Sequence, residues 1–314
     1  MLKTIALMAA LAFQSAAIPA TTVPAIQPEL RFPVISDTHV QSWDTRSQTK
    51  FKQALTDLHN VAPKSDAMVI TGDLGNGQPA DYAALSAILS GTPHPAQTLF
   101  TIGNHEFYKA WMNTSGQFSE KTFPNGETEQ ASITRFLHLT GESKVYYERW
   151  IKGYHFLVLG SEQYRQSNPA NLESAWLSSG QLHWLKEELK EKKEANRPIF
   201  VFLHQPIEQT VQGEELRAIL AEHPEVIFFS GHTHTYLGHP NTLMRDQFTR
   251  VNTSSVLDPV NGADQQISPE QSEGMVVSVY DDKVVIQGRD FHGKRWIEGA
   301  QYLIPLLTPT DQKL

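Results

Sequence analysis

Short apolar runs alternate with amphipathic segments along the first two-thirds of the chain. Apolar residues spaced by three and four positions, as in Phe51, Ala54 and Leu58, are typical of helices that bury one face. This pattern predicts helices at residues 47–60, 79–89, 129–139, 181–194 and 214–222. Continuous apolar runs between them predict buried strands at residues 30–36, 67–71, 97–102, 198–203 and 226–230.

Other parts of the chain follow a different pattern. Two apolar runs on either side of Lys152-Gly153 predict a β-hairpin, with strands at residues 145–150 and 154–159. After Gly238 the pattern is mostly that of strands, predicted at residues 248–253, 275–280 and 284–289. Two stretches show little periodicity and are expected to be long loops, at residues 107–128 and 160–180. The alternation of strands and helices favours an α/β fold with parallel strand pairing, and no linker or internal repeat divides it.

The first residues of the chain have the pattern of a targeting segment. Lys3 precedes an apolar stretch from Thr4 to Phe13, and small residues follow it up to Ala20. This is typical of a secretory signal peptide and is too short to span a bilayer stably. We therefore expect a signal peptide at residues 1–20, a flexible lead-in at residues 21–29 and a secreted or extracytoplasmic mature protein. The alternative is a buried N-terminal helix.

Charge and composition exclude several classes of function. The 314-residue chain has a formal net charge of −8 and no basic block, so we expect no nucleic-acid partner bound through its phosphates. No later stretch reaches the roughly 18 apolar residues of a membrane span, so none is expected in the mature chain. The chain contains no cysteine, which removes both disulfides and thiolate chemistry.

Polar side chains that can bind metals follow five of the predicted strands. They lie in Ser36-Asp37-Thr38-His39, Gly72-Asp73, Gly103-Asn104-His105-Glu106, Leu203-His204-Gln205-Pro206 and Gly231-His232-Thr233-His234. In open α/β sheets the working site lies at the carboxyl ends of the strands, so this rule brings these segments to one rim. Each segment alone has an ordinary structural explanation: Asp37 could cap a helix, and His204 could be a buried core histidine.

Together these side chains indicate a site for two metal ions. Four histidines, two aspartates and one amide exceed the ligands of one tetrahedral zinc and suit two divalent or trivalent ions such as Mn, Fe or Zn. Asp73 could bridge the ions through its two oxygens. Two ions about 3.5–4 Å apart can hold a bridging hydroxide and clamp a phosphoryl group for in-line attack.

The order of these segments resembles that of the calcineurin-like metallophosphoesterases, over roughly residues 30–255. The resemblance implies a four-layer α/β/β/α sandwich of two mixed β-sheets flanked by helices. It implies that Asp37, His39 and His234 hold the first metal, that Asn104, His204 and His232 hold the second, and that Asp73 bridges them. His105 would contact the phosphate or protonate the leaving group. Residues 256–314 would add the β-rich outer part of the second sheet and a surface extension.

Two positions differ from relatives within that family. The motif around His105 most often ends in Asp, whereas this chain has Glu106, which we expect to orient the His105 ring and raise its pKa. Purple acid phosphatases carry a tyrosine ligand three residues after the bridging aspartate, where this chain has Asn76. The chain is therefore not expected to belong to that subgroup.

The activity that the resemblance implies is hydrolysis of small-molecule phosphate monoesters or diesters, with diesters slightly favoured. The nucleophile would be the bridging hydroxide, and His105 and Glu106 would be the catalytic side chains. One alternative is a metal hydrolase of the amidohydrolase type, built on a barrel. Another is a non-catalytic scaffold with the same fold. An intact ligand set argues against the scaffold, and Asp-x-His coming first with His-x-His last argues against the barrel.

Overall fold

Two mixed β-sheets, each of six strands, form the centre of the computed structural model, which describes residues 27–191 and 197–306. The first sheet has the order β12-β11-β10-β1-β2-β3. Its strands are β1 (Leu30–Ile35), β2 (Met68–Ile70), β3 (Thr98–Phe100), β10 (Glu273–Val279), β11 (Lys283–Asp290) and β12 (Arg295–Pro305). The strands β1, β2 and β3 are parallel, and β10 joins β1 in antiparallel pairing from Leu30↔Val279 to Val34↔Met275.

The second sheet has the order β4-β5-β6-β7-β9-β8. Its strands are β4 (Tyr147–Ile151), β5 (Tyr154–Val158), β6 (Ile199–Phe202), β7 (Val226–Ser230), β8 (Leu243–Arg245) and β9 (Thr249–Asn252). The strands β4 and β5 form the predicted hairpin, and β5, β6, β7 and β9 run parallel. The first sheet therefore has a parallel side that ends at β3 and an antiparallel side that ends at β12, whereas the second sheet has a parallel centre with an antiparallel pair at each edge.

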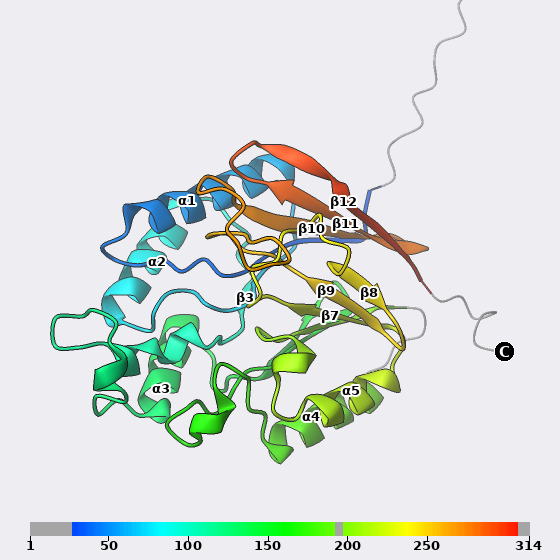
Figure 1. Cartoon of the computed structure of the whole chain (residues 1–314). Helices are drawn as coiled ribbons and strands as arrows, with labels where there is room; N and C mark the ends of the chain where they lie inside the picture. The colour runs from blue at the N-terminus through cyan, green and yellow to red at the C-terminus, as the bar shows by residue number, and fades with distance from the viewer. Residues whose placement is uncertain (1–26, 192–196, 307–314) are drawn as a thin grey trace, which may run out of the picture.

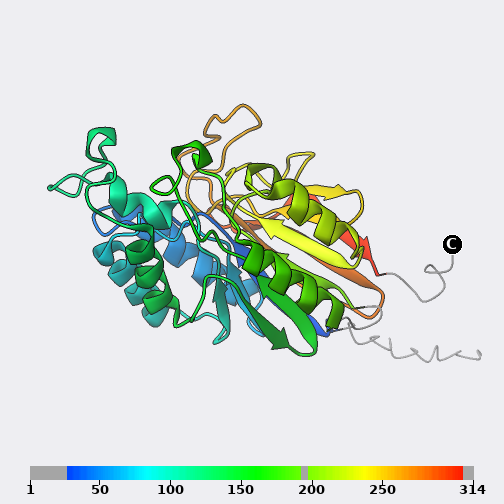
Figure 2. The same ribbon diagram turned by 90° about the horizontal axis from the view of Figure 1, so that it is seen from below.

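Helices cover the outer face of each sheet, which gives four layers (Figures 1 and 2). The helices α1 (Thr45–Val61) and α2 (Pro79–Gly91) lie over the first sheet, and α4 (Ser179–Glu191) and α5 (Gly213–Ala221) lie over the second. Near α2 lies α3 (Glu129–Thr140), beside the short 3-10 helix η1 (His105–Trp111). Asp44 caps α1, because its carboxylate accepts hydrogen bonds from the backbone N–H groups of Arg46 and Ser47. The described residues also form the 3-10 helices η2 (Glu120–Thr122), η3 (Pro169–Asn171) and η4 (Ile207–Gln209).

Three hydrophobic clusters fill the spaces between the four layers. One lies between the two sheets, where the ring of Phe32 lies 4.9 Å from the rings of Phe156 and of Phe200. The second joins α1 and α2 to the first sheet, and the third joins α4 and α5 to the second. The predicted four-layer α/β sandwich is confirmed, and its buried sheets give a rigid support for the loops at their carboxyl ends.

The C-terminal segment lies elsewhere than predicted. The expectation that residues 256–314 form the outer part of the second sheet is wrong, because β10, β11 and β12 extend the first sheet. Strand β10 is buried along its whole length and lies between β1 and β11, so it is a central strand. The division of the chain at residue 255 stays a prediction, although the pairing of β1 with β10 ties the two parts of the chain together.

Several local predictions also differ from the structure. Residues 105–111 form η1 where a loop was expected. The edge strand β12, of 11 residues, was not predicted because its sequence has mixed polarity. The helix predicted at 181–194 is described as far as Glu191, and its last three residues lie outside the described ranges. The signal peptide predicted at residues 1–20 and most of the lead-in also lie outside them. Among the described residues no helix is both long and apolar enough to cross a membrane.

Candidate metal centre

The five polar segments meet where the parallel strands of both sheets end. Asp37 and His39 follow β1, Asp73 follows β2, and Asn104 follows β3, whereas His204 follows β6 and His232 and His234 follow β7. Backbone hydrogen bonds hold neighbouring loops together, for example from Asp37 N to Gly72 O at 3.1 Å and from Gly231 N to His204 O at 2.9 Å. Loops far apart in the sequence therefore form one rim across the two sheets.

The backbone in these loops is left-handed at most of the donor residues. The φ angles are 53° at Asp37, 43° at His39, 51° at Asp73, 69° at His232 and 53° at His234. Non-glycine residues rarely adopt such angles, and strained backbone of this kind gathers at functional sites. The backbone of the Asp37-x-His39 and His232-x-His234 pairs is therefore not that of an extended strand. Tight turns aim these side chains toward a common centre.

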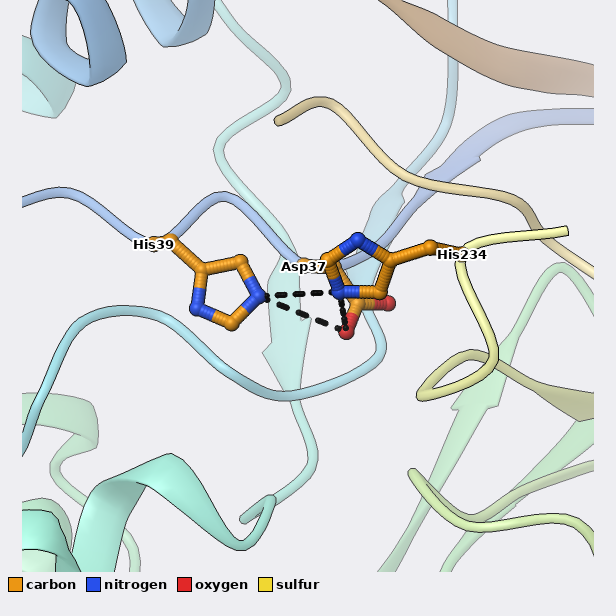
Figure 3. Close-up of side chains that lie close together, drawn as sticks. All are labelled: Asp37, His39 and His234. Carbon is orange, nitrogen blue, oxygen red and sulfur yellow. Dashed lines mark hydrogen bonds and ion pairs between the residues drawn. The ribbon is translucent and has the colours of Figure 1, made fainter. Parts of the chain in front are cut away.

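Asp37, His39 and His234 form the first group of donors (Figure 3). Asp37 Oδ1 lies 3.2 Å from His234 Nε2 and 3.7 Å from His39 Nε2, and the two Nε2 atoms are 3.1 Å apart. His234 Nδ1 donates a hydrogen bond to the carbonyl oxygen of Asp258, so its Nε2 is left to face the other donors. These are the three side chains predicted to hold the first metal.

Asp73, His204 and His232 form a second group. Asp73 Oδ2 lies 3.1 Å from His204 Nε2, and His204 Nδ1 donates to the carbonyl oxygen of Thr71 at 2.6 Å. The same Oδ2 lies 3.9 Å from His39 Nε2 in the first group. Asp73 Oδ1, by contrast, accepts a hydrogen bond from the backbone N–H of His105. Asp73 Oδ2 therefore lies near histidines of both groups, and the bridging of two ions by Asp73 stays a prediction.

Three buried atoms that could bind a metal make no hydrogen bond, although two of them lie near an oppositely charged group: Asp37 Oδ1, Asn104 Oδ1 and His204 Nε2. A buried polar atom without a partner is costly, and native proteins normally satisfy it. The side chains of Asp37, Asn104 and His204 are almost fully buried, with exposed fractions of 0%, 3% and 0%. Oxygen and imidazole donors that converge in this way fit two ions of intermediate hardness. The residues present therefore fit a two-metal centre.

Charge in the cluster shifts the pKa values of its histidines in opposite directions. Burial opposes protonation of His204 and His234, yet the carboxylates of Asp73 and Asp37 raise the pKa of His204 to about 10 and that of His234 to about 9. Burial lowers the pKa of His232 to about 4, with the neighbouring His204 adding to the shift. The carboxyls of Asp37 and Asp73 have pKa values well below their usual range, because nearby imidazolium groups outweigh burial. The ionised carboxylates of the centre therefore favour cations beside them.

Two glycines allow the ligand loops to pack this closely. A Cβ atom at Gly103 would lie 2.2 Å from Asp73 Oδ1, and one at Gly231 would lie 1.8 Å from Ser36 Oγ. Neither position can hold a side chain without moving a donor loop. This explains why both Asn104 and His232 are preceded by glycine.

His105 lies at the edge of the centre, and its ring is fixed by two neighbours. Its Nδ1 is 2.8 Å from Asn76 Oδ1, and its ring stacks on Tyr108 with centroids 3.8 Å apart. His105 Nε2 lies 3.9 Å from Asp73 Oδ2, so the ring reaches the centre through this atom. Since the oxygen of Asn76 can only accept, the ring donates from Nδ1 and keeps Nε2 for the site.

Glu106 does not have the predicted role. Its carboxylate accepts hydrogen bonds from three backbone N–H groups, of Gly103 at 2.6 Å, Leu74 at 2.8 Å and Asp73 at 3.1 Å. It is fully buried and joins the loops after β2 and β3, whereas Asn76 holds the His105 ring. Burial, together with the His39 and His204 imidazoles, also lowers the pKa of His105 to about 3, although the Asp73 carboxylate acts to raise it. The expectation that Glu106 orients the His105 ring and raises its pKa is therefore wrong.

Sequence reasoning missed three residues that organise the centre. Asn76 was noted only as the replacement of a tyrosine ligand, although its place after Gly72-Asp73 was a usable signal. Glu173 accepts a hydrogen bond from Asn104 Nδ2 at 2.9 Å, and the carbonyl oxygen of Asp258 accepts one from His234. Both come from irregular segments without a motif. The other predicted site residues all lie at the centre, and their role as metal ligands stays a prediction.

Comparison with known proteins gives the family. Residues 30–236 match the sequence profile of the calcineurin-like phosphoesterases, and the chain belongs to this family. Comparison with curated protein sequences gave no match. The fold also excludes the amidohydrolase alternative, because the described strands form two facing sheets and no barrel.

Solved structures share the fold at low sequence identity. A dimetal phosphatase from Danio rerio matches with a TM-score of 0.63 and 16% identity, over 90% of this chain and 100% of its own. A purple acid phosphatase from yellow lupin (Lupinus luteus) matches with a TM-score of 0.58 and 14% identity, over 88% of this chain and 53% of its own. GAP50, the anchor in the inner membrane complex of Plasmodium, matches with a TM-score of 0.54 and 13% identity, over 90% of both chains.

Proposed function

We propose that the chain is a phosphoesterase with a dinuclear metal centre that hydrolyses small phosphate esters. Asp37, His39 and His234 would hold one ion, Asn104, His204 and His232 the other, and Asp73 would help to hold both. The observation that carries the proposal is the convergence of two groups of metal-binding side chains, in each of which the possible ligand atoms lie within 4.8 Å of one another: Asp37, His39 and His234, and Asp73, His204 and His232. Mn, Fe and Zn are the ions that suit this mixture of carboxylate, amide and imidazole donors.

When bound, two such ions supply a hydroxide nucleophile at neutral pH and neutralise charge on the phosphoryl oxygens. The chain's own residues hold and orient the reacting groups. The His105 ring, fixed by Asn76 and Tyr108, presents Nε2 to the centre. A phosphoryl anion beside this ring would favour its protonated form, because an opposite charge raises the pKa of an imidazole. His105 would then stabilise the phosphoryl oxygens or give its proton to the leaving group.

Diesters are the substrates that we favour slightly over monoesters. The motif Gly103-Asn104-His105-Glu106 resembles that of cyclic-nucleotide-phosphodiesterase-like members of the family. The test is to load the metal-stripped protein with Mn, Fe or Zn and to compare bis-p-nitrophenyl phosphate with p-nitrophenyl phosphate. We expect turnover of both and a higher kcat/KM for the diester. A kcat/KM for the diester no higher than that for the monoester would contradict the proposed substrate preference. No turnover of either ester with any metal would contradict the proposed phosphoesterase activity.

A scaffold without catalysis is the second candidate, because GAP50 has a similar fold and is described as an anchor. Binding of a protein partner by a chain with no ester turnover would favour it. The complete donor set argues for the enzyme, since a scaffold has no need of seven converging metal donors.

We also propose that the mature protein acts outside the cytoplasm, on the basis of the signal-peptide pattern at residues 1–20. Such a location favours scavenging of phosphate esters, nucleotides or phospholipid headgroups over turnover of an intracellular messenger. N-terminal sequencing of exported protein should give a start between about residues 18 and 30. A sequence that begins at Met1 would contradict this proposal.

A further inference from the structure

The two halves of the centre carry unequal charge. Besides the shared Asp73, the ligands proposed for the first ion include the carboxylate of Asp37. Those proposed for the second ion, Asn104, His204 and His232, are neutral when they bind a metal. A site with fewer anionic ligands binds a cation more weakly. The metal affinity of the second half therefore depends more strongly on groups that hydrogen-bond to its ligands.

Glu173 is such a group. Its Oε2 accepts a hydrogen bond from Asn104 Nδ2 at 2.9 Å, and Asn104 Oδ1 is the buried donor atom without a partner. The carboxylate thus fixes which end of the amide faces the metal position. Because it accepts from the amide nitrogen, it also increases the electron density on Oδ1 and makes this oxygen a stronger ligand.

Glu173 is itself held in place from several sides. Its Oε1 accepts a hydrogen bond from Arg165 Nη2 at 2.5 Å, and the hydroxyl of Tyr164 lies 3.0 Å from Oε2. Its backbone carbonyl accepts from Gln205 Nε2 at 3.1 Å, and Gln205 directly follows the ligand His204. Glu173 therefore contacts one ligand of the second group and the neighbour of another.

We infer that Glu173 is a positioning residue that sets the affinity of the second metal position through Asn104. The inference rests on the proposed two-metal function and deepens it. The irregular segment of residues 160–178 supplies no ligand of its own, and through Glu173 it controls the occupancy of one metal position more than the other. A carboxylate behind a ligand typically changes metal affinity by about 10-fold to 100-fold.

The test is titration of the metal-stripped full mature chain with Mn²⁺ by calorimetry, with three variants. Glu173→Gln removes the charge and keeps an oxygen that can accept from Asn104, whereas Glu173→Ala removes both. Glu162→Gln is the matched control, because Glu162 lies in the same segment and accepts from Ser178 N and Gln181 Nε2, away from the ligands. Electron paramagnetic resonance of the same samples distinguishes paired from single Mn²⁺ ions.

We expect the second Mn²⁺ to bind about 10-fold more weakly in Glu173→Gln and up to about 100-fold more weakly in Glu173→Ala, while the first stays nearly unchanged. The signal of paired ions should then require excess metal, and kcat of Glu173→Gln should recover at saturating Mn²⁺. Unchanged affinity of the second ion in Glu173→Ala would overturn the inference. An equal loss at both positions, with a lower melting temperature, would also overturn it and make Glu173 a structural residue. Absence of Mn²⁺ binding to the unmodified chain would instead overturn the proposed function.

Discussion

Asn76 Oδ1 and His105 Nδ1 lie 2.8 Å apart, and this contact links the loop after β2 to the first residue of η1. The contact fixes the tautomer of the ring, so that Nε2 faces the metal centre. The position that holds a tyrosine ligand in purple acid phosphatases thus serves here to orient a histidine. The contact also explains how His105 keeps its orientation while Glu106 is bonded elsewhere.

Replacement of Asn76 should change the chemistry of His105 without removing metal. Asn76→Leu frees the ring and should lower kcat by up to about 10²-fold, a part of the usual contribution of an acid–base group. Asn76→Asp places a carboxylate beside the ring, which raises the pKa of His105. The protonated ring then persists to higher pH, so the alkaline limb of the pH–rate profile should move upward. Asn60→Leu, on the exposed end of α1, is the control. An unchanged kcat and pH profile in both Asn76 variants would contradict the role of the contact.

His105→Ala should keep both metals and lose rate according to the leaving group. If His105 protonates the departing oxygen, the loss should reach about 10²–10⁴-fold for an alkyl ester. It should be smaller for p-nitrophenyl esters, since p-nitrophenolate departs without a proton. Rates for the two ester types and metal content per chain check this prediction. Equal losses would favour a purely electrostatic role, and loss of a metal would show that His105 is a ligand, as its 3.9 Å distance to Asp73 Oδ2 permits.

Glu106→Gln should act on stability and on the Asp73 loop. The carboxylate accepts three backbone N–H bonds, and a glutamine amide offers only one oxygen for them. At least one buried donor would lose its partner, which costs about 1–3 kcal/mol of the free energy of unfolding. Chemical denaturation of the metal-stripped protein measures this cost. If stability held and only the rate for poor leaving groups fell, Glu106 would act on His105 after all.

The order of strand ends made it predictable that most of these side chains lie at one site. Each of Asp37, Asp73, Asn104, His204 and His232 follows an apolar run, and the carboxyl-end rule for parallel strands is enough to bring them together. The confirmed α/β class came from the same alternation. The pattern of single segments was therefore enough to predict both the layered fold and the position of the candidate centre.

Contacts between segments without a pattern could not be predicted in this way. Glu173 lies 69 residues from Asn104 in an irregular stretch, and nothing local marks it as a partner of the ligand. The pairing of β10 with β1 depends on which sheet has an open edge, which the sequence of β10 does not state. Glu106 was misassigned because adjacency to His105 suggested contact, whereas the turn directs its side chain to the backbone of Gly103 and Leu74.

Asp73→Asn should cost more activity than Asn104→Ala. Asp73 Oδ2 lies within 3.1 Å of His204 Nε2 and 3.9 Å of His39 Nε2, so its charge serves both groups of donors. Asn104 offers one neutral oxygen to one group. Metal content measured together with the rates checks the difference. An Asp73→Asn protein with an unchanged metal count would contradict the bridging role.

The most direct test of the account is the activity of the metal-stripped protein as Mn²⁺ is added back. Seven side chains are proposed to bind the metals, and three of their buried atoms make no hydrogen bond in the protein. We therefore expect the stripped chain to be inactive toward bis-p-nitrophenyl phosphate. Activity should return with the second ion bound per chain and should stay constant beyond it. Full activity in the chelated, metal-free protein, or full activity with one ion bound, would contradict a dinuclear centre.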